Sequence, residues 1–120
     1  VLCLHLGLLG FERKKQLRIL NQHLEQVRHE HDAIIIGGDF NDWSGRQVQR
    51  LLDPTLELKE VFMQSSQHYA KTFPARWPLF QMDRIYFSGL ELLSCSCLDS
   101  SAWRLMSDHV PLLARFELKN

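Results

Sequence analysis

The spacing of apolar residues predicts a strand–helix–strand unit at the start of the chain. Residues 1–6 have an apolar, strand-like pattern. Between residue 12 and about residue 30, apolar side chains recur three and four positions apart, which is typical of a helix with one buried stripe. The stripe consists of Leu17, Leu20, Leu24 and Val27. Residues 33–36 form an uninterrupted apolar run rich in β-branched isoleucine, which predicts a strand buried on both faces. A crossover of this length places both strands in one sheet.

The elements predicted after this unit are shorter. Residues 44–47 resemble a capping box and predict a short helix that ends before Asp53 and Pro54. Residues 56–62 fit either a helical turn or a short strand. Residues 82–87 and 90–98 predict two strands that pair as a hairpin across a turn at Gly89, and residues 110–118 predict a last strand. The stretches predicted to be loops are residues 64–68, 72–78 and 99–107.

Polar side chains come directly after the apolar run at residues 33–36. Gly37 and Gly38 interrupt this strand where the backbone must bend or approach another group closely. Asp39 and Asn41 follow two positions apart, so an extended backbone would project both side chains to one side. These residues could simply cap the turn after the strand. However, the carboxyl end of a central strand is also where α/β proteins bind ligands.

Other polar residues end other elements, and each has an ordinary structural explanation when considered alone. His5 ends an apolar strand, which is typical of a satisfied core histidine. Asp83 precedes Arg84, and this pair is typical of a surface ion pair. Asp108 and His109 could be turn residues before the last strand. Together with the polar pair after residue 38, however, four separate element ends present Asp, Asn or His, and such convergence is how active sites are usually built.

Composition and charge limit the classes of function. The chain has 120 residues, so it forms at most one domain. With 45% hydrophobic and 23% charged residues, it is typical of a globular protein rather than a disordered one. Fourteen Lys and Arg residues balance fourteen Asp and Glu residues, so there is no overall attraction to nucleic acid or to an anionic membrane. No apolar run approaches the ~18 residues of a transmembrane segment.

The three cysteines predict a reduced protein. Cys95 and Cys97 would lie on one face of a strand, and Cys3 leaves an odd number. We expect all three to be reduced, small apolar core residues, which favours the cytoplasm. A structural zinc site is the weaker alternative, because no second Cys/His pair at zinc spacing is present.

The polar residue types fit hydrolysis of a phosphate ester. Carboxylates hold a hard divalent cation such as Mg²⁺, and the cation polarises the phosphoryl group. A histidine can titrate near neutral pH or donate to the phosphate, and a further carboxylate can orient that histidine.

Three motifs, in this order, resemble the endonuclease/exonuclease/phosphatase superfamily. They are Gly38-Asp-Phe-Asn41, Met82-Asp-Arg-Ile85 and Ser107-Asp-His-Val-Pro111, with His5-Leu6 upstream. The superfamily includes pancreatic-type deoxyribonuclease, abasic-site endonucleases, inositol polyphosphate 5-phosphatases and neutral sphingomyelinases. The stretch from His5 to Leu8, with Arg13 and Gln16, looks most like uncharacterised bacterial members.

The resemblance implies a deoxyribonuclease I-like α/β fold, a four-layer α/β/β/α sandwich. On this basis residues 1–120 are the C-terminal portion of one domain whose N-terminal half is absent, and they hold mainly one mixed sheet with flanking helices. The family's first half supplies an asparagine and the principal metal-binding glutamate, and no residue here matches them. We therefore expect the piece alone to be inactive, and to self-associate through its exposed sheet face or to be poorly stable.

The activity implied by the resemblance is that of a Mg²⁺- (or Mn²⁺-) dependent phosphoesterase, in which an activated water hydrolyses a phosphodiester or phosphomonoester. Asp39 is implied to position or deprotonate that water and to contact the metal. Asn41 is implied to contact the scissile phosphate or the metal. Asp108 matches a metal-associated carboxylate.

The remaining implied roles concern the phosphate and the substrate. His109 matches a histidine that contacts the phosphate or acts as acid or base. Asp83 matches the carboxylate that orients this histidine, and His5 matches a second active-site histidine. Arg76 and Trp43 are candidate substrate contacts.

The substrate class remains open at this point. The phosphate ester could belong to nucleic acid, phospholipid or a small molecule. A nuclease acting on DNA or RNA is one alternative, which the zero net charge disfavours because non-specific nucleases track the backbone with basic surface. A non-catalytic binding module that retains the fold is another, which the presence of all four polar clusters disfavours.

Overall fold

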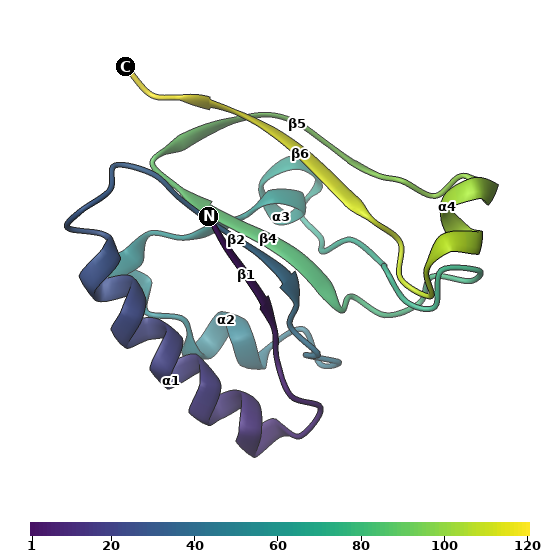
Figure 1. Cartoon of the computed structure of the whole chain (residues 1–120), viewed down its shortest axis with the longest axis horizontal. Coiled ribbons are helices and arrows are strands. Elements are labelled where there is room, and N and C mark those ends of the chain that lie inside the picture. The colour runs from purple at the N-terminus through teal and green to yellow at the C-terminus, as the bar shows by residue number, and fades with distance from the viewer.

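A computed structural model describes all 120 residues as a mixed α/β structure with two sheets (Figure 1). The elements, in order, are β1 (Leu2–His5), α1 (Gly10–Val27), β2 (Ile34–Asp39), α2 (Gln47–Leu51), the 3-10 helix η1 (Pro54–Leu56), β3 (Lys59–Glu60), α3 (Val61–Ser66), β4 (Asp83–Ser88), β5 (Leu90–Cys97), α4 (Ser101–Met106) and β6 (Leu112–Leu118). The strand–helix–strand prediction is confirmed, because β1 and β2 are parallel neighbours joined through α1.

The first sheet has four strands in the order β1-β2-β4-β3. Strand β2 pairs in parallel with β1, in a register that places His5 opposite Asp39. It pairs antiparallel with β4, which places Asp39 opposite Asp83. Three strand ends that carry candidate side chains therefore meet at one edge of this sheet.

The predicted hairpin between β4 and β5 is wrong. Strand β5 pairs with β6 in a separate two-stranded sheet. Strand β4 already has β2 on one side and β3 on the other, so neither of its edges is free for β5. The chain leaves the first sheet at Gly89, where φ is +72° and an added Cβ would lie 1.9 Å from the backbone oxygen of Asp32.

Three shorter predictions also need correction. Residues 99–107 are not only loop, because they contain α4, whose residues are all exposed and form no apolar stripe. Residues 64–66 belong to α3 rather than to a loop. The capping box at residues 44–47 does not form; the Ser44 hydroxyl instead donates to Asp42 Oδ1, and Asp42 Oδ2 accepts from the Val48 amide. The ambiguous stretch 56–62 contains both a short strand and the start of a helix.

Two apolar clusters cover the two faces of the first sheet. Helix α1 and helix α2 lie on one face, where Leu17, Leu24 and Val48 pack with Ile36 of β2. The β5–β6 pair and α3 lie on the other face, where Phe87 of β4 packs with neighbours including Ile35 and Phe116. Figure 1 shows this arrangement, with α1 and α2 on one side of the sheet and β5 and β6 on the other.

The three cysteines are free. The prediction that they are buried core residues is wrong. Cys3 is exposed, and Cys95 and Cys97 are only partly buried. Burial raises the pKa of the Cys97 thiol, and the nearby Asp99 acts in the same direction. Cys3 lies on the face of β1 that β5 and β6 do not reach, whereas its neighbours Leu2 and Leu4 pack on the helix side.

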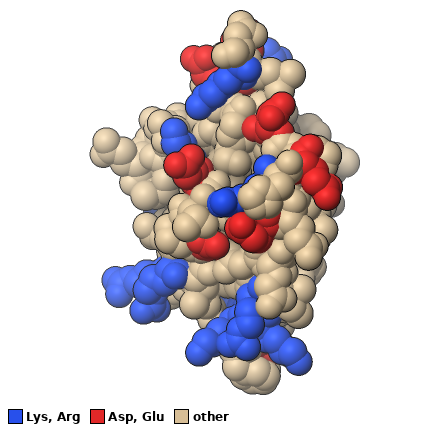
Figure 2. All heavy atoms as spheres, turned by 90° about the vertical axis from the view of Figure 1, so that its left-hand side faces the viewer, with Lys and Arg blue, Asp and Glu red and all other residues tan.

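Charged side chains form local groups although the total charge is zero. Figure 2 shows basic side chains gathered at the lower end of one face, at the height where α1 begins in Figure 1. The first half of α1 carries Arg13, Lys14, Lys15 and Arg18. Among the helices, none combines the length and the apolar character that a bilayer-crossing segment requires.

Candidate active site

The turn after β2 fixes the position of Asp39. Its Oδ1 accepts a hydrogen bond of 2.8 Å from the backbone amide of Asn41, which has a left-handed φ of +48°. Gly38 has φ +146°, and a Cβ there would lie 1.9 Å from the backbone oxygen of Leu4. Only glycine therefore allows β1 to approach this closely and to place His5 beside the carboxylate.

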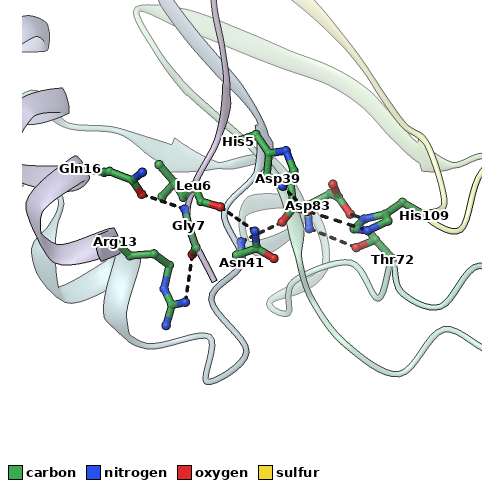
Figure 3. A network of polar contacts seen from close by, with 10 residues as sticks. All are labelled: His5, Leu6, Gly7, Arg13, Gln16, Asp39, Asn41, Thr72, Asp83 and His109. Atoms are coloured by element: carbon green, nitrogen blue, oxygen red, sulfur yellow. Dashed lines mark hydrogen bonds and ion pairs between the residues drawn. The ribbon is translucent and has the colours of Figure 1, made fainter. Parts of the chain in front are cut away.

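The side chain of Asn41 is held by the loop that follows β1 (Figure 3). Its Nδ2 donates to the backbone oxygen of Leu6 over 2.6 Å, and the residue is 5% exposed. The loop is held in turn by α1: Gln16 Oε1 accepts from the Gly7 amide at 2.8 Å, and the Arg13 guanidinium donates to the Gly7 oxygen at 3.2 Å. Since the amide nitrogen of Asn41 is engaged, its Oδ1 is the atom available to a ligand.

Asp83 and His109 form a short polar contact in the site. His109 Nδ1 lies 2.6 Å from Asp83 Oδ2. Thr72 holds both segments, because its hydroxyl accepts from the Asp83 amide at 3.1 Å and its backbone oxygen accepts from the Val110 amide at 2.7 Å. Thr72 itself is fully buried.

The pKa of His109 is raised above its ordinary value. Partial burial alone would lower this pKa, since it disfavours the charged imidazolium. The hydrogen bond to Asp83 and the charges of Asp83, Asp39 and Asp108 favour the charged form and outweigh the burial. Protonated His109 is therefore stabilised in a site that contains three carboxylates.

Asp39 lies between two imidazoles. Its Oδ2 is 3.5 Å from Nε2 of His5 and 3.9 Å from Nε2 of His109. His5 is thus no core histidine, because its side chain is 75% exposed. Ligand atoms of Asp39, Asp83 and His109 all lie within 4.8 Å of one another, which is close enough for a single metal ion.

These groups line a cavity of about 530 Å³. The cavity contains most of the residues singled out from the sequence: His5, Asp39, Asn41, Trp43, Asp83, Asp108 and His109. Leu8, Phe73 and Met82 line it as well. Asp108 is exposed, and its carboxylate lies outside the compact group of three ligands although it faces the same cavity.

The two predicted substrate contacts lie in different places. Trp43 is half-exposed and packs on Phe80, with ring centroids 4.6 Å apart. Phe73 lies 5.0 Å from the His109 ring, so aromatic faces form one wall of the cavity. Arg76 does not line this cavity and instead lines a neighbouring hollow.

The predicted surface ion pair between Asp83 and Arg84 is wrong. Arg84 is fully buried, and its Nη1 lies 3.6 Å from Oδ2 of the equally buried Asp42. Successive strand residues point to opposite faces, so Arg84 points away from Asp83 and into the layer beneath the site. Its guanidinium also donates to the Asp42 and Gln81 backbone oxygens and lies 4.1 Å from the Tyr69 ring.

This buried pair was missed by sequence reasoning, and it fixes the site from behind. Asp42 follows the turn that carries Asp39, while Arg84 belongs to the strand that carries Asp83. Burial would raise the pKa of Asp42, but hydrogen bonds from Val48 and Ser44 and the charge of Arg84 lower it overall. Side chains alternate between the two faces of β4, so a candidate site residue at Asp83 implies that Arg84 points into the interior. This alternation is the sequence feature that could have identified Arg84 as buried.

The chain resembles known proteins over most of its length. The profile of the Endonuclease/Exonuclease/phosphatase family matches residues 3–109. The uncharacterised protein YbhP of Escherichia coli (strain K12) is 34% identical over 98% of this chain and 46% of its own length. A functionally unknown conserved protein from Enterococcus faecalis V583 superposes with a TM-score of 0.77, at 23% identity, over 98% of this chain and 49% of that one. A mannosyl-6-phosphatase of Bacteroides thetaiotaomicron VPI-5482 superposes with a TM-score of 0.76 at 18% identity. The superposition covers 97% of this chain and 50% of that one.

These likenesses confirm the fold class expected from the motifs, an α/β deoxyribonuclease I-like structure. The chain spans about half the length of the proteins it matches. The family match begins within β1, includes β2 and β4, and reaches His109. The chain belongs to the Endonuclease/Exonuclease/phosphatase family.

Proposed function

We propose that the protein containing this chain is a Mg²⁺- or Mn²⁺-dependent phosphoesterase that hydrolyses a phosphate ester with an activated water. The observation that supports this most is the position of Asp39, whose carboxylate lies within 4 Å of two imidazoles at the wall of one cavity. A carboxylate flanked by two histidines can orient a water and stabilise charge on a phosphoryl group.

The histidines and carboxylates would divide the work. The hydrogen bond to Asp83 places the Nδ1 proton of His109, so Nε2 faces Asp39 and the cavity. The raised pKa of His109 keeps more of it protonated near neutral pH, which suits donation to a phosphate oxygen or to a leaving group. Asp39 would accept a proton from the attacking water or hold that water in line.

The donor set fits a divalent cation. Asp39 would hold it, and Asn41 Oδ1 and the Asp108 carboxylate line the same cavity as further oxygen donors. When bound, the cation supplies positive charge to the phosphoryl oxygens. Asp83 is less suited to this role because its Oδ2 is engaged by His109.

The other half of the family domain would complete the site. This chain spans 46–50% of the proteins it matches, so further ligands and catalytic groups would come from outside it. We therefore propose that residues 1–120 alone have little or no activity. The free cysteines are in keeping with a reducing compartment such as the cytoplasm.

A nuclease acting on DNA or RNA is the second candidate. The Phe73 ring lies beside His109, and the Trp43 ring packs against Phe73 in the same cavity. Nucleic-acid bases stack on such rings. The zero net charge argues against a surface that tracks a phosphate backbone without sequence preference. The salt dependence of DNA binding by the full-length protein distinguishes a nuclease from a phosphoesterase that acts on other substrates. The affinity of a nuclease for DNA should fall steeply as the salt concentration rises.

The proposal is tested with the full-length protein and two chromogenic substrates, bis(p-nitrophenyl) phosphate and p-nitrophenyl phosphate. We expect hydrolysis with Mg²⁺ or Mn²⁺ and none with EDTA. Asp39→Asn should lower kcat at least about 100-fold, whereas Asp32→Asn, at the opposite end of β2, should leave it unchanged. Absence of hydrolysis under all these conditions, or full activity of Asp39→Asn, would favour a non-catalytic binding module instead.

A further inference from the structure

A second hollow lies directly beside the candidate active site. It has a volume of about 390 Å³ and is lined by residues of two segments, 74–76 and 104–108. Asp108 lines both this hollow and the active-site cavity, so the two spaces are neighbours across one residue. A substrate bound at His109 could extend into the hollow past Asp108.

Two arginines line this hollow, and neither has a partner within the chain. Arg76 comes from the loop before β4, and Arg104 comes from α4. Neither guanidinium lies within 4 Å of a carboxylate, and neither donates a hydrogen bond. By contrast, Arg13, Arg28 and Arg84 each donate at least one hydrogen bond. Two unpaired guanidiniums from different segments in one hollow are suited to a phosphate group.

The backbone that carries Arg76 is tied to the active site. The Ala75 amide donates to the backbone oxygen of Asp108 over 2.7 Å, and Ala75 is 1% exposed. The Trp77 amide donates to the Pro74 oxygen over 3.0 Å, which closes a turn around Arg76. The backbone of Arg76 is therefore placed relative to His109, which is one residue beyond Asp108.

The rest of the lining limits the kind of ligand. Leu105 and Met106 contribute apolar surface beside Arg104. A bare inorganic ion would leave this surface unused, whereas a phosphate attached to a carbon skeleton would contact it. The Asp108 carboxylate would repel an anion, but as a metal ligand in the proposed reaction its charge is offset by the cation.

We propose that this hollow is a subsite for a second phosphate group on the same substrate molecule, bound by Arg76 and Arg104. This rests on the proposed phosphoesterase function and narrows its substrate class to esters that carry a phosphate beyond the one hydrolysed. The second phosphate could belong to a short nucleotide strand or to a bisphosphorylated sugar.

Paired substrates that differ by one phosphate test the subsite in the full-length protein. One pair is the dinucleotide TpT and its 5′-phosphorylated form pTpT; the other is glucose 6-phosphate and glucose 1,6-bisphosphate. In the double variant Arg76→Gln/Arg104→Gln, kcat/KM should fall about tenfold more for the two-phosphate member, mainly through KM, because charge-assisted hydrogen bonds are lost. The pair that shows this difference identifies the source of the phosphate.

Matched variants distinguish the subsite from a general effect of charge. Arg18→Gln/Arg50→Gln removes the same charge from exposed positions of α1 and α2 and should not change the ratio between paired substrates. Arg76→Lys/Arg104→Lys should retain part of the preference, because the charge remains while the paired donors are lost. An unchanged ratio in Arg76→Gln/Arg104→Gln, or an equal change in the control, would overturn the subsite.

A binding measurement keeps this test separate from the proposed activity. Inorganic pyrophosphate is titrated into the wild type and the Arg76→Gln/Arg104→Gln variant by calorimetry, with inorganic phosphate as the reference. We expect pyrophosphate to bind at least about tenfold more weakly to the variant. If the chromogenic substrates and both substrate pairs all resist hydrolysis, the phosphoesterase proposal fails. In that event equal pyrophosphate affinity would overturn the subsite, and a weakened affinity would support it.

Discussion

The two faces of the first sheet are covered to different extents. On the helix side, ten buried residues form one cluster, and Leu17, Leu24, Ile36, Phe40 and Val48 are all fully buried. On the other side, only five residues are buried, and the surrounding apolar side chains remain partly exposed. The helix side is therefore a complete core within this chain, whereas β5, β6 and α3 leave much of the apolar surface on the opposite face partly exposed.

The comparison bears on how the candidate site is held. Asp39 and Asp83 point to the same side of the sheet as Ile35 and Phe87, but the groups that hold them are well buried. Arg84 and Asp42 support the site from beneath, and Thr72 joins Asp83 to the segment around His109. The less complete face contributes His109, which precedes β6, but its apolar side chains are only partly buried. A change among those apolar side chains should therefore alter stability or association more than catalysis.

Adjacent isoleucines of β2 give the sharpest test of the comparison. Ile36 faces the helix side and is 0% exposed, while Ile35 faces the β5–β6 side and is partly buried. Ile36→Ala should lower the free energy of unfolding by about 3–4 kcal/mol and Ile35→Ala by about 1–2 kcal/mol, because a cavity in a complete core costs more. Urea denaturation of the full-length protein measures both. Equal losses would mean that the second face is as well packed as the first in the whole domain.

The glycine pair before Asp39 gives the next largest effect. At Gly38 an added Cβ would collide with the Leu4 backbone, and φ is +146°, whereas at Gly37 the nearest atoms are 3.9 Å away. Gly38→Ala should destabilise the protein by about 2–3 kcal/mol, and Gly37→Ala by less than about 1 kcal/mol. The same denaturation experiment decides this. A Gly37→Ala variant as unstable as Gly38→Ala would show that close approach of β1 is not the cause.

The raised pKa of His109 predicts a smaller, pH-dependent effect. A pKa that is higher in the folded state stabilises the protein fully below about pH 6.5, the value of a free histidine, and the contribution is lost as pH rises through the folded value. Asp83→Asn should lower the pKa of His109, so this variant should lose more stability at pH 6 than at pH 9. Titration of the His109 ring by NMR measures the shift directly, with Asp32→Asn as the control. An Asp83→Asn protein with an unchanged His109 pKa would contradict the assigned contact.

Association of the 120-residue chain gives the smallest expected change in stability. Cys3 is exposed on the side of β1 that β5 and β6 do not cover, and β1 is an edge strand. We expect the isolated chain to self-associate there, and Cys3→Lys to reduce the associated fraction while changing stability by less than about 0.5 kcal/mol. Sedimentation velocity provides the measurement, with Leu9→Lys on the loop before α1 as the control. A monomeric wild-type chain at high concentration would refute this expectation.

Local patterns in the sequence were enough for the helix-side half of the fold. The 3.6-residue spacing that includes Leu17 and Leu24 predicted α1, and the apolar run before Gly37 predicted β2. The pairing of β5 was not predictable in this way, because it depends on which edges of β4 are already occupied. Helix α4 has no buried residue, so no apolar period indicates it.

In the candidate site, too, local sequence patterns predicted some residues and missed those that depend on contacts between distant segments. The motifs identified side chains that the structure brings to one cavity, including Asp39, Asp83 and His109. They did not identify the Asp42–Arg84 pair, because its formation depends on the turn after β2 meeting strand β4 beneath the sheet edge. The position of Arg76 beside a separate hollow likewise depends on the hydrogen bond between Ala75 and Asp108, which no local pattern contains.

The most direct test of the site is whether Asp39 and His109 act as one unit in phosphoester hydrolysis. The full-length protein is compared with Asp39→Asn, His109→Gln and the double variant on bis(p-nitrophenyl) phosphate with Mg²⁺. Each single change should lower kcat by about 100-fold or more. The kcat of the double variant should be only slightly below that of the less active single variant, because the effects of residues that act as one unit are not additive. Activity that survives either change, or losses that multiply in the double variant, would contradict a shared site.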